Sequence, residues 1–491
     1  RQQIATGFCR NHRINSEDGS IPEEWRAEYV ADRVDTFGTV FLGLTVGCAR
    51  CHDHKFDPVS QREYYELFAY FNSVAESGVG PNDGNSPPFI DVPSDWRHLD
   101  DEDCEFIVPE PVKLQRAREA AGNGLRRPKP GAPSTVMVMH DLKKPRETYL
   151  LRRGQYNEPD RRRKLFPGVP SAVSPKGSLD GQPASRLGLA HWLFHPEHPL
   201  TSRVAVNRIW QHFFGSGLVA SPDNFGVQGA RPSHPELLDW LATEFMRSGW
   251  DVQAVQRLIL MSQAYSRDSS YRSDSSVRDP ENRFLARGPR VRMTAFMLRD
   301  QALAASGLLI HRLGGPSVKP YMPPKIWSSM SNNRYEQDQG EGLFRRSVYT
   351  YWRRTIPPPS MMNFNAANRE VCSVSYSTTD TPLQALTLMN NKTFVESSKW
   401  LAARMIGRDR DPIPYGFRLV LSRRPSDAER ALLEESLKEF TSEFEREPAS
   451  ARQLLRIGEA NGPLPAEESH LAAMTMVASM LLNLDEAVTK D

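Results

Sequence analysis

Recurring helix-start signatures constrain the fold of this chain more than any other feature. A Ser or Thr followed three residues later by Glu or Gln, just before apolar residues at helical spacing, marks a helix N-terminus. The pattern occurs at Ser60–Glu63, Ser233–Glu236, Thr381–Gln384 and Ser426–Glu429. Further helices are expected from Pro22, from Asp251, from Thr294 to a stop at Gly307, and from Leu471 to Leu484. These signals predict a mainly α fold with small β additions.

Strand signals are few and short. Runs rich in β-branched and aromatic residues predict strands at 135–139, 148–151 and 347–352. Between about 77 and 183, Gly, Pro, Ser and charged residues dominate, and RRPKPGAPS (126–134) is the clearest linker signal. We therefore expect a helical region over 1–76, an irregular region with a few strands over 77–183, and a larger helical domain over 184–491.

Length and charge exclude several classes of protein. A chain of 491 residues is too long for one ordinary core. Its 62 Lys and Arg against 60 Asp and Glu give a net charge of +2, which disfavours a nucleic-acid binder that neutralises phosphates. No apolar run reaches the roughly 18 residues of a membrane-spanning helix. Five cysteines, an odd number in a long chain, exclude a disulfide-dense scaffold.

The segment GCARCHDHKFDP, residues 47–58, carries the clearest chemical signal. CxxCH is the attachment signature of c-type haem, in which two thiols form thioethers and the adjacent His ligates iron. The two-residue spacing presents both sulfurs to one porphyrin edge and places the next residue beneath the iron. We therefore predict that Cys48, Cys51 and His52 bind haem c covalently.

Zinc is the main alternative to haem at this segment. Cys48, Cys51, His52 and His54 offer four suitable ligands, with His52 and His54 as the imidazole donors. A structural zinc site usually pairs two knuckles, however, and the chain has no second CxxC. A redox-active dithiol or a plain disulfide would not need His52. Haem is the favoured interpretation.

The sixth ligand of such a haem stays open. Met137 and Met139 are candidates whose thioether would raise the potential, although ordinary packing explains each of them as well. His12, His140 and His234 are weaker candidates, since each also fits an ordinary polar role. His54 follows His52 too closely to reach the opposite face of the ring, so a bond to a propionate or to a backbone carbonyl is expected for it.

Other patterns are less specific. Asp53 and Asp57 flank the cysteines and are expected to bind the loop backbone or a cation. Tyr349, Tyr351, Trp352, Arg353 and Arg354 form an aromatic and basic cluster suited to a carbohydrate or anion cleft, with simple packing as the alternative. No Ser-His-Asp order, P-loop or dinucleotide-binding glycine pattern occurs, so no catalytic residue is assigned.

Long stretches of the chain resemble a known domain pair. ATGFCRNH (5–12), EEWRAEYVADRVDT (23–36) and the segment 41–72 around the cysteines resemble the planctomycete cytochrome-like domain DUF1549. The segments 186–219, 233–245 and 381–391, with NREVC (368–372) and the ending 481–491, resemble its partner DUF1553. The resemblance implies the haem role of Cys48, Cys51 and His52, and His54 with Lys55 matches the pair that usually follows. Cys9 departs from the pattern and is assigned no role.

The resemblance also implies a setting for the protein. Related proteins carry an export signal and an upstream segment with its own CxxCH, so we expect the chain to be N-terminally truncated before Arg1. They are often encoded beside sulfatase-like proteins, which points to polysaccharide breakdown. Covalent haem attachment takes place outside the cytoplasm, so a periplasmic or cell-surface location is expected.

Two functions from different classes follow. The first is an exported c-type haem protein in electron transfer or an oxidoreductase assembly, with a redox protein as partner and sulfatase-like proteins or polysaccharide nearby. The alternative is a carbohydrate-active or carbohydrate-binding protein whose CxxCH loop is structural or holds zinc. If the protein is an enzyme, an oxidoreductase is expected. Neither nucleic acid nor a membrane span is expected in this chain.

Overall fold

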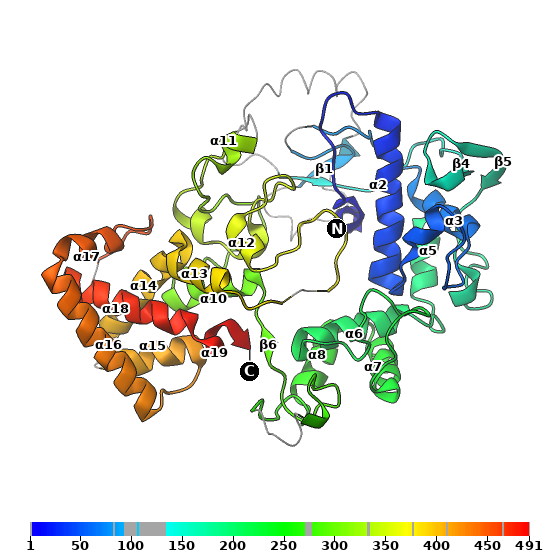
Figure 1. Ribbon diagram of the computed structural model, residues 1–491. Helices are drawn as coiled ribbons and strands as arrows, with labels where there is room; N and C mark the ends of the chain where they lie inside the picture. Colours follow the sequence, from blue (N-terminus) through cyan, green and yellow to red (C-terminus); the bar gives the residue numbers. More distant parts are fainter. Residues whose placement is uncertain are drawn as a thin grey trace. The chain divides into compact units, whose positions relative to one another are not determined.

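The computed structural model describes residues 2–81, 84–92, 106–107, 134–270, 277–330, 334–375, 378–408, 411–463 and 466–490 (Figure 1). These residues form two compact units. Unit 1 comprises 1–289 with 369–375, and unit 2 comprises 290–368 with 376–491. Helices dominate both units, which confirms the mainly α prediction. The linker signal at 126–133 and Cys104 lie outside the described residues.

Unit 1 combines helices with short antiparallel strands. Its helices are α1 (Gln2–Ala5), α2 (Pro22–Phe37), α3 (Gln61–Phe71), α5 (Arg186–Leu193), α6 (Thr201–Phe214), α7 (Pro235–Arg247) and α8 (Val252–Leu260). Its 3-10 segments are η1 (Thr6–Arg10), η3 (Val46–Arg50), η6 (Arg152–Gly154) and η7 (Ser171–Val173), and η2 (Gly38–Leu42) is a π-helical turn. Its strands are β1 (Phe89–Val92), β2 (Phe106–Ile107), β3 (Ser134–Met137), β4 (Thr148–Leu151) and β5 (Pro159–Leu165).

The main core of unit 1 joins segments far apart in the chain. Figure 1 shows α2 and α3 side by side with α5 beside them. Buried side chains of α2 and α3 pack with Leu150 and Leu165 of the β4–β5 pair and with Trp192 of α5, which is fully buried. The region 1–76 therefore shares one hydrophobic core with residues more than one hundred positions later.

The second helix of the motif region begins with the predicted capping box. Ser60 Oγ accepts a hydrogen bond from Glu63 N at 3.2 Å, and Glu63 Oε2 accepts one from Ser60 N at 2.8 Å. The other Glu63 oxygen accepts from the backbone and hydroxyl of Ser171. The box thus satisfies two free donors of α3 and ties the helix start to η7.

Replacing Ser60 by alanine removes this cap. We expect Ser60→Ala to lower the free energy of unfolding by about 1 kcal/mol, because Glu63 N loses its acceptor. Chemical denaturation of the variant measures the change. Ser60→Thr keeps the hydroxyl and serves as the control, so equal losses in both variants would contradict the role of the cap.

The β4–β5 hairpin contains an irregularity of three residues. Tyr149 pairs with Lys164, and the next residue, Leu150, pairs with Asp160. Residues 161–163 therefore have no partner opposite them on β4 and bulge out of the ladder. Strands were predicted at 135–139 and 148–151. β4 confirms the second, and β3 confirms the first except for residues 138 and 139, which follow the strand.

Unit 2 is built on a helical core. Its helices are α10 (Ala295–Ser306), α11 (Ile326–Met330), α12 (Pro359–Asn363), α13 (Pro382–Asn390), α14 (Lys392–Arg408), α15 (Pro412–Leu421), α16 (Asp427–Arg446), α17 (Pro448–Leu455), α18 (Glu468–Asn483) and α19 (Asp485–Val488). The short strands β6 (Val291–Arg292) and β7 (Thr489–Lys490) pair antiparallel, and η8 (Gly340–Phe344) and η9 (Ser347–Tyr349) are 3-10 segments. The α18 helix lies against α14 and α16 and is buried along most of its length.

Most predicted helix ends are confirmed, and two local predictions are wrong. Asp251, Thr294, Thr381 and Ser426 cap their helices as expected, and Gly307 ends α10. Ser233 does not cap α7, because Pro235 starts that helix one residue later and His234 occupies the N-cap position. The segment 347–352 is no strand. It forms η9 and one isolated bridge at Thr350, since the prolines that follow stop any extended ladder.

Candidate functional site

The two motif cysteines lie on one face of a short 3-10 segment between α2 and α3. Cys48 lies within η3, and Cys51 N donates to Cys48 O at 3.4 Å. Cys51 follows η3 as its C-cap residue, and a 3-10 turn brings residues three apart to the same side of the backbone. Both thiols are free and both residues are exposed. The structure therefore presents the pair to solvent as an accessible dithiol.

His52 follows the pair with one ring nitrogen engaged. Its Nδ1 lies 2.7 Å from the carbonyl oxygen of Asp53, and the residue is exposed. A carbonyl oxygen only accepts, so Nδ1 carries the proton in this hydrogen bond and Nε2 keeps its lone pair. Iron-ligating imidazoles have this arrangement, in which a backbone carbonyl fixes the tautomer and the other nitrogen is left for the metal.

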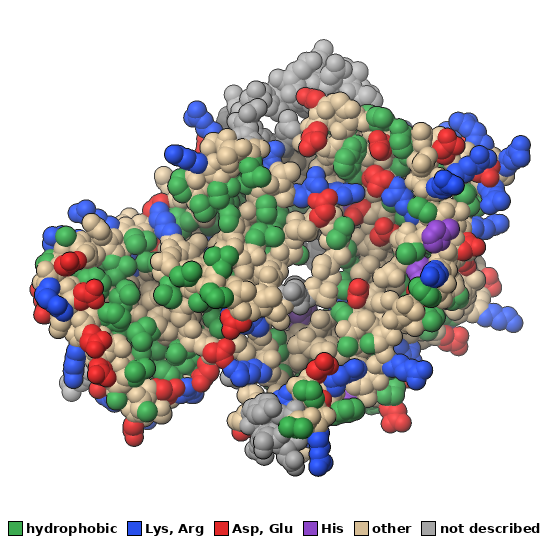
Figure 2. Space-filling model, viewed as in Figure 1, with side chains coloured by type: hydrophobic (Ala, Val, Ile, Leu, Met, Phe, Trp, Pro, Cys, Tyr) green, Lys and Arg blue, Asp and Glu red, His purple; other side chains and the backbone are tan. Residues whose placement is uncertain are grey.

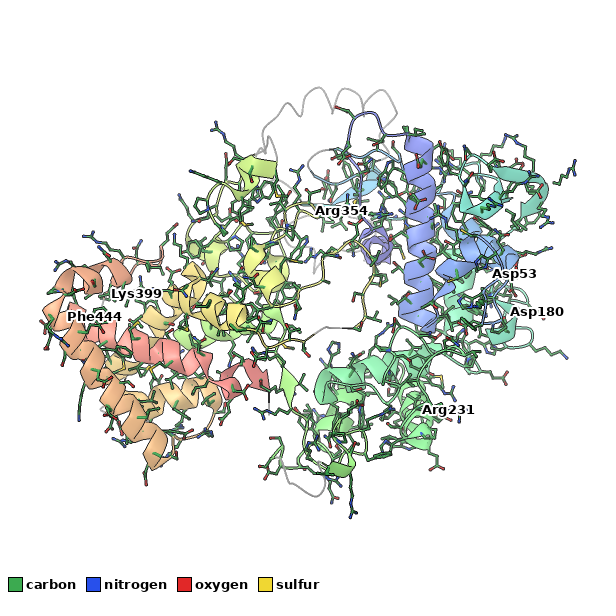
Figure 3. The ribbon with its side chains drawn as sticks, in the orientation of Figure 1. Asp53, Asp180, Arg231, Arg354, Lys399 and Phe444 are labelled. Carbon is green, nitrogen blue, oxygen red and sulfur yellow. The ribbon has the colours of Figure 1, made fainter. Side chains whose placement is uncertain are left out.

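The His54 side chain accepts hydrogen bonds from the backbone of its own loop. Its Nδ1 accepts from Asp57 N at 2.8 Å and from Phe56 N at 3.3 Å, so Nδ1 is unprotonated. Its side chain is 6% exposed. Asp53 Oδ1 accepts from Gln61 N at 2.8 Å, and Figure 3 shows Asp53 beside the start of α3. Asp53 and His54 thus hold the loop backbone, as was expected for Asp53.

Among the described residues, no group of three or more His, Cys, Asp or Glu side chains is placed to hold a metal ion. His52 and His54, the two imidazoles predicted as metal ligands, have different roles here. His52 faces solvent and His54 accepts backbone hydrogen bonds. Zinc binding by this segment stays a prediction, and the experiment below distinguishes it from haem.

Arg50, one of the two residues between the cysteines, anchors the loop. Its guanidinium forms a bidentate ion pair with Glu28 of α2 and donates to Gly154 O at 3.2 Å. The hydrogen bonds from Arg50 hold the pKa of Glu28 below its usual value. Gln61 Nε2 donates to Arg50 O at 3.1 Å, and Tyr65 Oη donates to the same oxygen at 2.9 Å. The loop is therefore fixed at both the side chain and the backbone of Arg50.

The β4–β5 hairpin lies directly against Cys51. Cys51 Sγ donates to Arg153 O at 3.3 Å, and Gln61 Nε2 reaches Leu151 O at 3.3 Å. Gly154 has a φ of 72°, and a Cβ there would lie 3.1 Å from Cys51 Sγ. Glycine is needed at this position both for its backbone conformation and for its small size. Sequence reasoning missed this neighbour, and the run RRRK in β5 is the signal that could have drawn attention to it.

The half-buried Asp35, with its Oδ1 atom fully buried, lies beneath the loop. A Cβ on Gly47 would lie 3.3 Å from Asp35 Oδ1, and this oxygen has no hydrogen-bond partner among the described residues. Burial raises the pKa of Asp35 to about 6, and the nearby Arg50 opposes the shift. Sequence reasoning did not single out Asp35, because an acidic residue within a helix is ordinarily expected on the exposed face.

Asp35 makes stability depend on pH. Its pKa is higher in the folded protein than in the unfolded chain, so the folded state loses stability as pH rises from about 4 through about 6. We expect Asp35→Asn to raise the free energy of unfolding at pH 8 by up to about 3 kcal/mol and to have little effect at pH 4. Urea denaturation at both pH values measures this. The exposed Asp180→Asn serves as control, and an equal shift at both pH values for Asp35→Asn would contradict the assignment.

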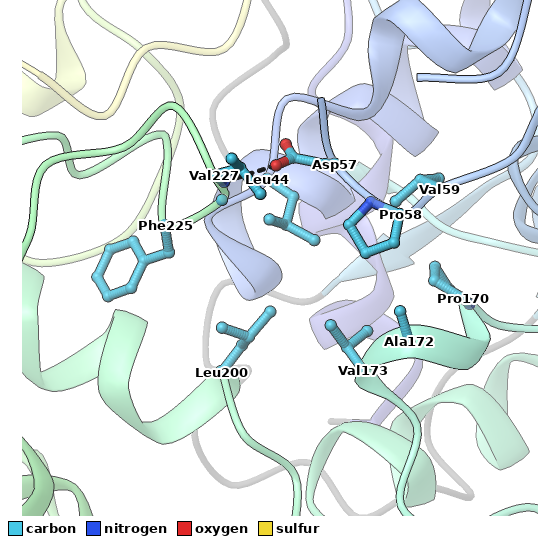
Figure 4. Close-up of a pocket in the computed structure, with 11 residues that line it drawn as sticks. Leu44, Asp57, Pro58, Val59, Pro170, Ala172, Val173, Leu200, Phe225 and Val227 are labelled. Carbon is cyan, nitrogen blue, oxygen red and sulfur yellow. Dashed lines mark hydrogen bonds between the residues drawn. The ribbon is translucent and has the colours of Figure 1, made fainter. Parts of the chain in front are cut away.

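A cavity of about 330 Å³ adjoins the end of the motif loop (Figure 4). It is lined mainly by apolar side chains, with the Asp57 carboxylate as its charged group. Asp57 Oδ1 accepts from Val227 N at 2.7 Å, and a Cβ on Gly226 would lie 2.3 Å from that oxygen. Asp57 thus binds the backbone of the loop after α6, whereas the backbone of the cysteine loop itself was expected.

The other sequence candidates lie in varied surroundings. Met139 is buried in the core of unit 1, and Met137 is half-buried. His12 packs on Tyr29 and contacts Arg33, and burial lowers the pKa of His12. His140 is half-buried, and His234 contacts Ser233 at the start of α7. The sixth haem ligand stays a prediction.

Residues of the aromatic and basic cluster contact other side chains and backbone of unit 2. Arg345 lies 3.8 Å from the Tyr349 ring centroid, and the hydroxyl of Tyr349 accepts from Gly314 N. Arg353 lies over Trp327 at 5.6 Å, and Tyr351 contacts Lys319. These contacts fit the packing interpretation of the cluster.

No described helix is long and apolar enough to cross a membrane.

No curated protein and no solved structure matches the chain. Two family models do match. Residues 1–76 match PSCyt2, a protein of unknown function (DUF1549), and residues 185–437 match PSD1, a protein of unknown function (DUF1553). The second match covers more than half of the 491 residues, so the chain belongs to the DUF1553 family and carries a DUF1549 segment before it.

Proposed function

We propose that the chain is a c-type haem protein that transfers electrons, with haem held by Cys48, Cys51 and His52. One observation carries the proposal. The two thiols are exposed on one face of η3, and His52 beside them keeps Nε2 free while Nδ1 is held by a carbonyl. These are the groups that covalent haem attachment uses.

The chain's own residues suit this role. Each thiol would add across one vinyl group, its sulfur bonding one carbon and its hydrogen going to the other, so attachment needs no oxidant. Arg50, held by Glu28 and Gln61, fixes the loop that spaces the two sulfurs. The bound haem would supply one-electron redox chemistry. Exposure of the site favours exchange with another protein over turnover in an enclosed pocket.

The setting of this function is part of the proposal. Covalent haem attachment outside the cytoplasm implies a periplasmic or cell-surface protein. A redox protein, within an oxidoreductase assembly, is the expected partner. The resemblance to proteins encoded beside sulfatase-like proteins supports a link to polysaccharide breakdown.

Haem and metal analysis of the full chain tests the proposal. The chain is expressed with cytochrome maturation machinery, denatured, separated on a gel and stained for haem, and elemental analysis is run on the same preparation. We expect haem that stays bound after denaturation, with iron and no zinc. A colourless protein that contains stoichiometric zinc would support the zinc alternative, and a colourless protein without metal would overturn both.

A further inference from the structure

We propose that the β4–β5 hairpin is the docking surface for an acidic redox protein, beside the site of Cys51. The inference rests on the proposed function and names the chemistry of its partner. The surface, called here the basic hairpin patch, consists of Arg152, Arg153, Arg161, Arg162, Arg163 and Lys164. All six are exposed, and Figure 2 shows Lys and Arg side chains gathered over this hairpin.

The charge of the hairpin is unusual for this chain. Residues 152–166 contain six Lys or Arg and two Asp or Glu, a net charge of +4, whereas the whole chain has a net charge of +2. Lys164 pairs with Glu147, and Arg163 lies 3.5 Å from Asp160. The other four guanidinium groups have no ion pair within the described ranges. The hairpin is therefore a local concentration of unneutralised positive charge.

The backbone of the hairpin presents these charges outward. Residues 161–163 occupy the bulge, where no residue of β4 lies opposite. Leu165 just after them is buried, so the strand stays anchored while its three arginines face solvent. Exposed side chains of like charge do not contribute to packing. A β-bulge typically changes the direction in which side chains point, and here the bulge holds the three arginines.

The patch is placed next to the proposed redox group. Arg153 O accepts from Cys51 Sγ, and Gly154 O accepts from Arg50. Gln61 binds Arg50 O and Leu151 O together, which fixes the hairpin against the motif loop. A protein seated on the patch would therefore contact the edge of the chain at which Cys51 is exposed.

An acidic protein fits this surface better than a long polyanion does. The charges are confined to one hairpin, and Phe166 at its end is 69% exposed with Lys164 5.9 Å from its ring centroid. An apolar side chain within a charged rim is typical of protein interfaces. Opposite charge steers such encounters and raises the association rate by about tenfold or more at low salt.

Binding of an acidic flavodoxin, used as the probe, tests the patch. The triple variant Arg161→Gln, Arg162→Gln and Arg163→Gln is compared with Arg247→Gln, Arg257→Gln and Arg278→Gln, which removes three exposed charges elsewhere in unit 1. We expect the association rate to fall by about tenfold in the first variant and to change little in the second. The difference should vanish at high ionic strength.

The outcomes separate this inference from the haem proposal. Equal association rates for the two variants would overturn the docking surface, whatever the haem stain shows. Tighter patch-dependent binding of heparin or of a DNA duplex than of flavodoxin would overturn the choice of an acidic protein. Patch-dependent flavodoxin binding by a chain without haem would support the surface while the proposed electron transfer fails.

Discussion

Replacing Cys48 and Cys51 together by alanine is expected to remove all haem that survives denaturation. In the proposed function both thioether bonds would form on the sulfurs of this pair, and η3 with the residue that follows it holds no other thiol. Each single variant should keep one bond and still stain. His52→Ala should keep covalent haem but change its absorption spectrum, because His52 is the residue that would hold the iron.

Cys372→Ser provides the matched control, since Cys372 is another exposed free cysteine of unit 1. It should stain as strongly as the wild-type chain. The measurement is the ratio of haem stain to protein on a denaturing gel, with the absorption spectrum of the native protein. Undiminished staining of the double variant would show that haem binds elsewhere, and the proposed function would then fail.

Glu76→Gln is expected to cause the largest loss of stability among conservative substitutions in unit 1. The Glu76 carboxylate is buried and accepts hydrogen bonds from both Arg10 and Arg33. Arg10 also donates to Ser86 O, and Arg33 to Cys9 O, so the network joins three chain segments. A neutral amide leaves two buried cations without a counter-charge, which costs about 3–5 kcal/mol.

Chemical denaturation measures this loss, with Glu244→Gln as the control. Glu244 pairs with Arg247 on the exposed face of α7, and such a surface pair contributes less than about 1 kcal/mol. Burial alone would raise the pKa of Glu76, but Arg33, His12 and Arg10 together hold it well below 4.5. Its contribution is therefore complete above about pH 4.5 and is lost as pH falls further. A similar loss for both variants would contradict the role of the network.

Local structure was predictable where a short pattern decides it. Ser60 and Ser426 cap their helices because side-chain and backbone groups within four residues satisfy each other. The strand predicted at 347–352 failed partly because prolines follow it and partly for a non-local reason. The backbone of Tyr349 and Tyr351 bonds to Val318, a pairing that no local pattern specifies. Ser233 failed because Pro235 is a stronger start signal than the serine.

Sequence reasoning singled out the candidate site only through Cys48, Cys51 and His52. These residues lie close together in the sequence, so their spacing alone suggests the haem chemistry that stays a prediction. The contact between Cys51 and Arg153 spans about one hundred residues, and the Asp57 bond to Val227 spans 170. Such pairings follow from the packing of a shared core, which periodicity within single elements does not encode.

Arg208 of α6 shows how closely the two family segments depend on each other. Its guanidinium donates to the carbonyls of Thr39 and Val40, in the π-helical turn that ends α2. Phe225 N likewise donates to Gly43 O. A recombination event that moved residues 1–76 alone into another protein would leave these carbonyls without their donors. It would also separate 16 buried residues of the main core of unit 1 from the seven that come later in the chain. The structural unit is thus larger than the DUF1549 match, and a transferable module would have to include α6 and the loop that follows it.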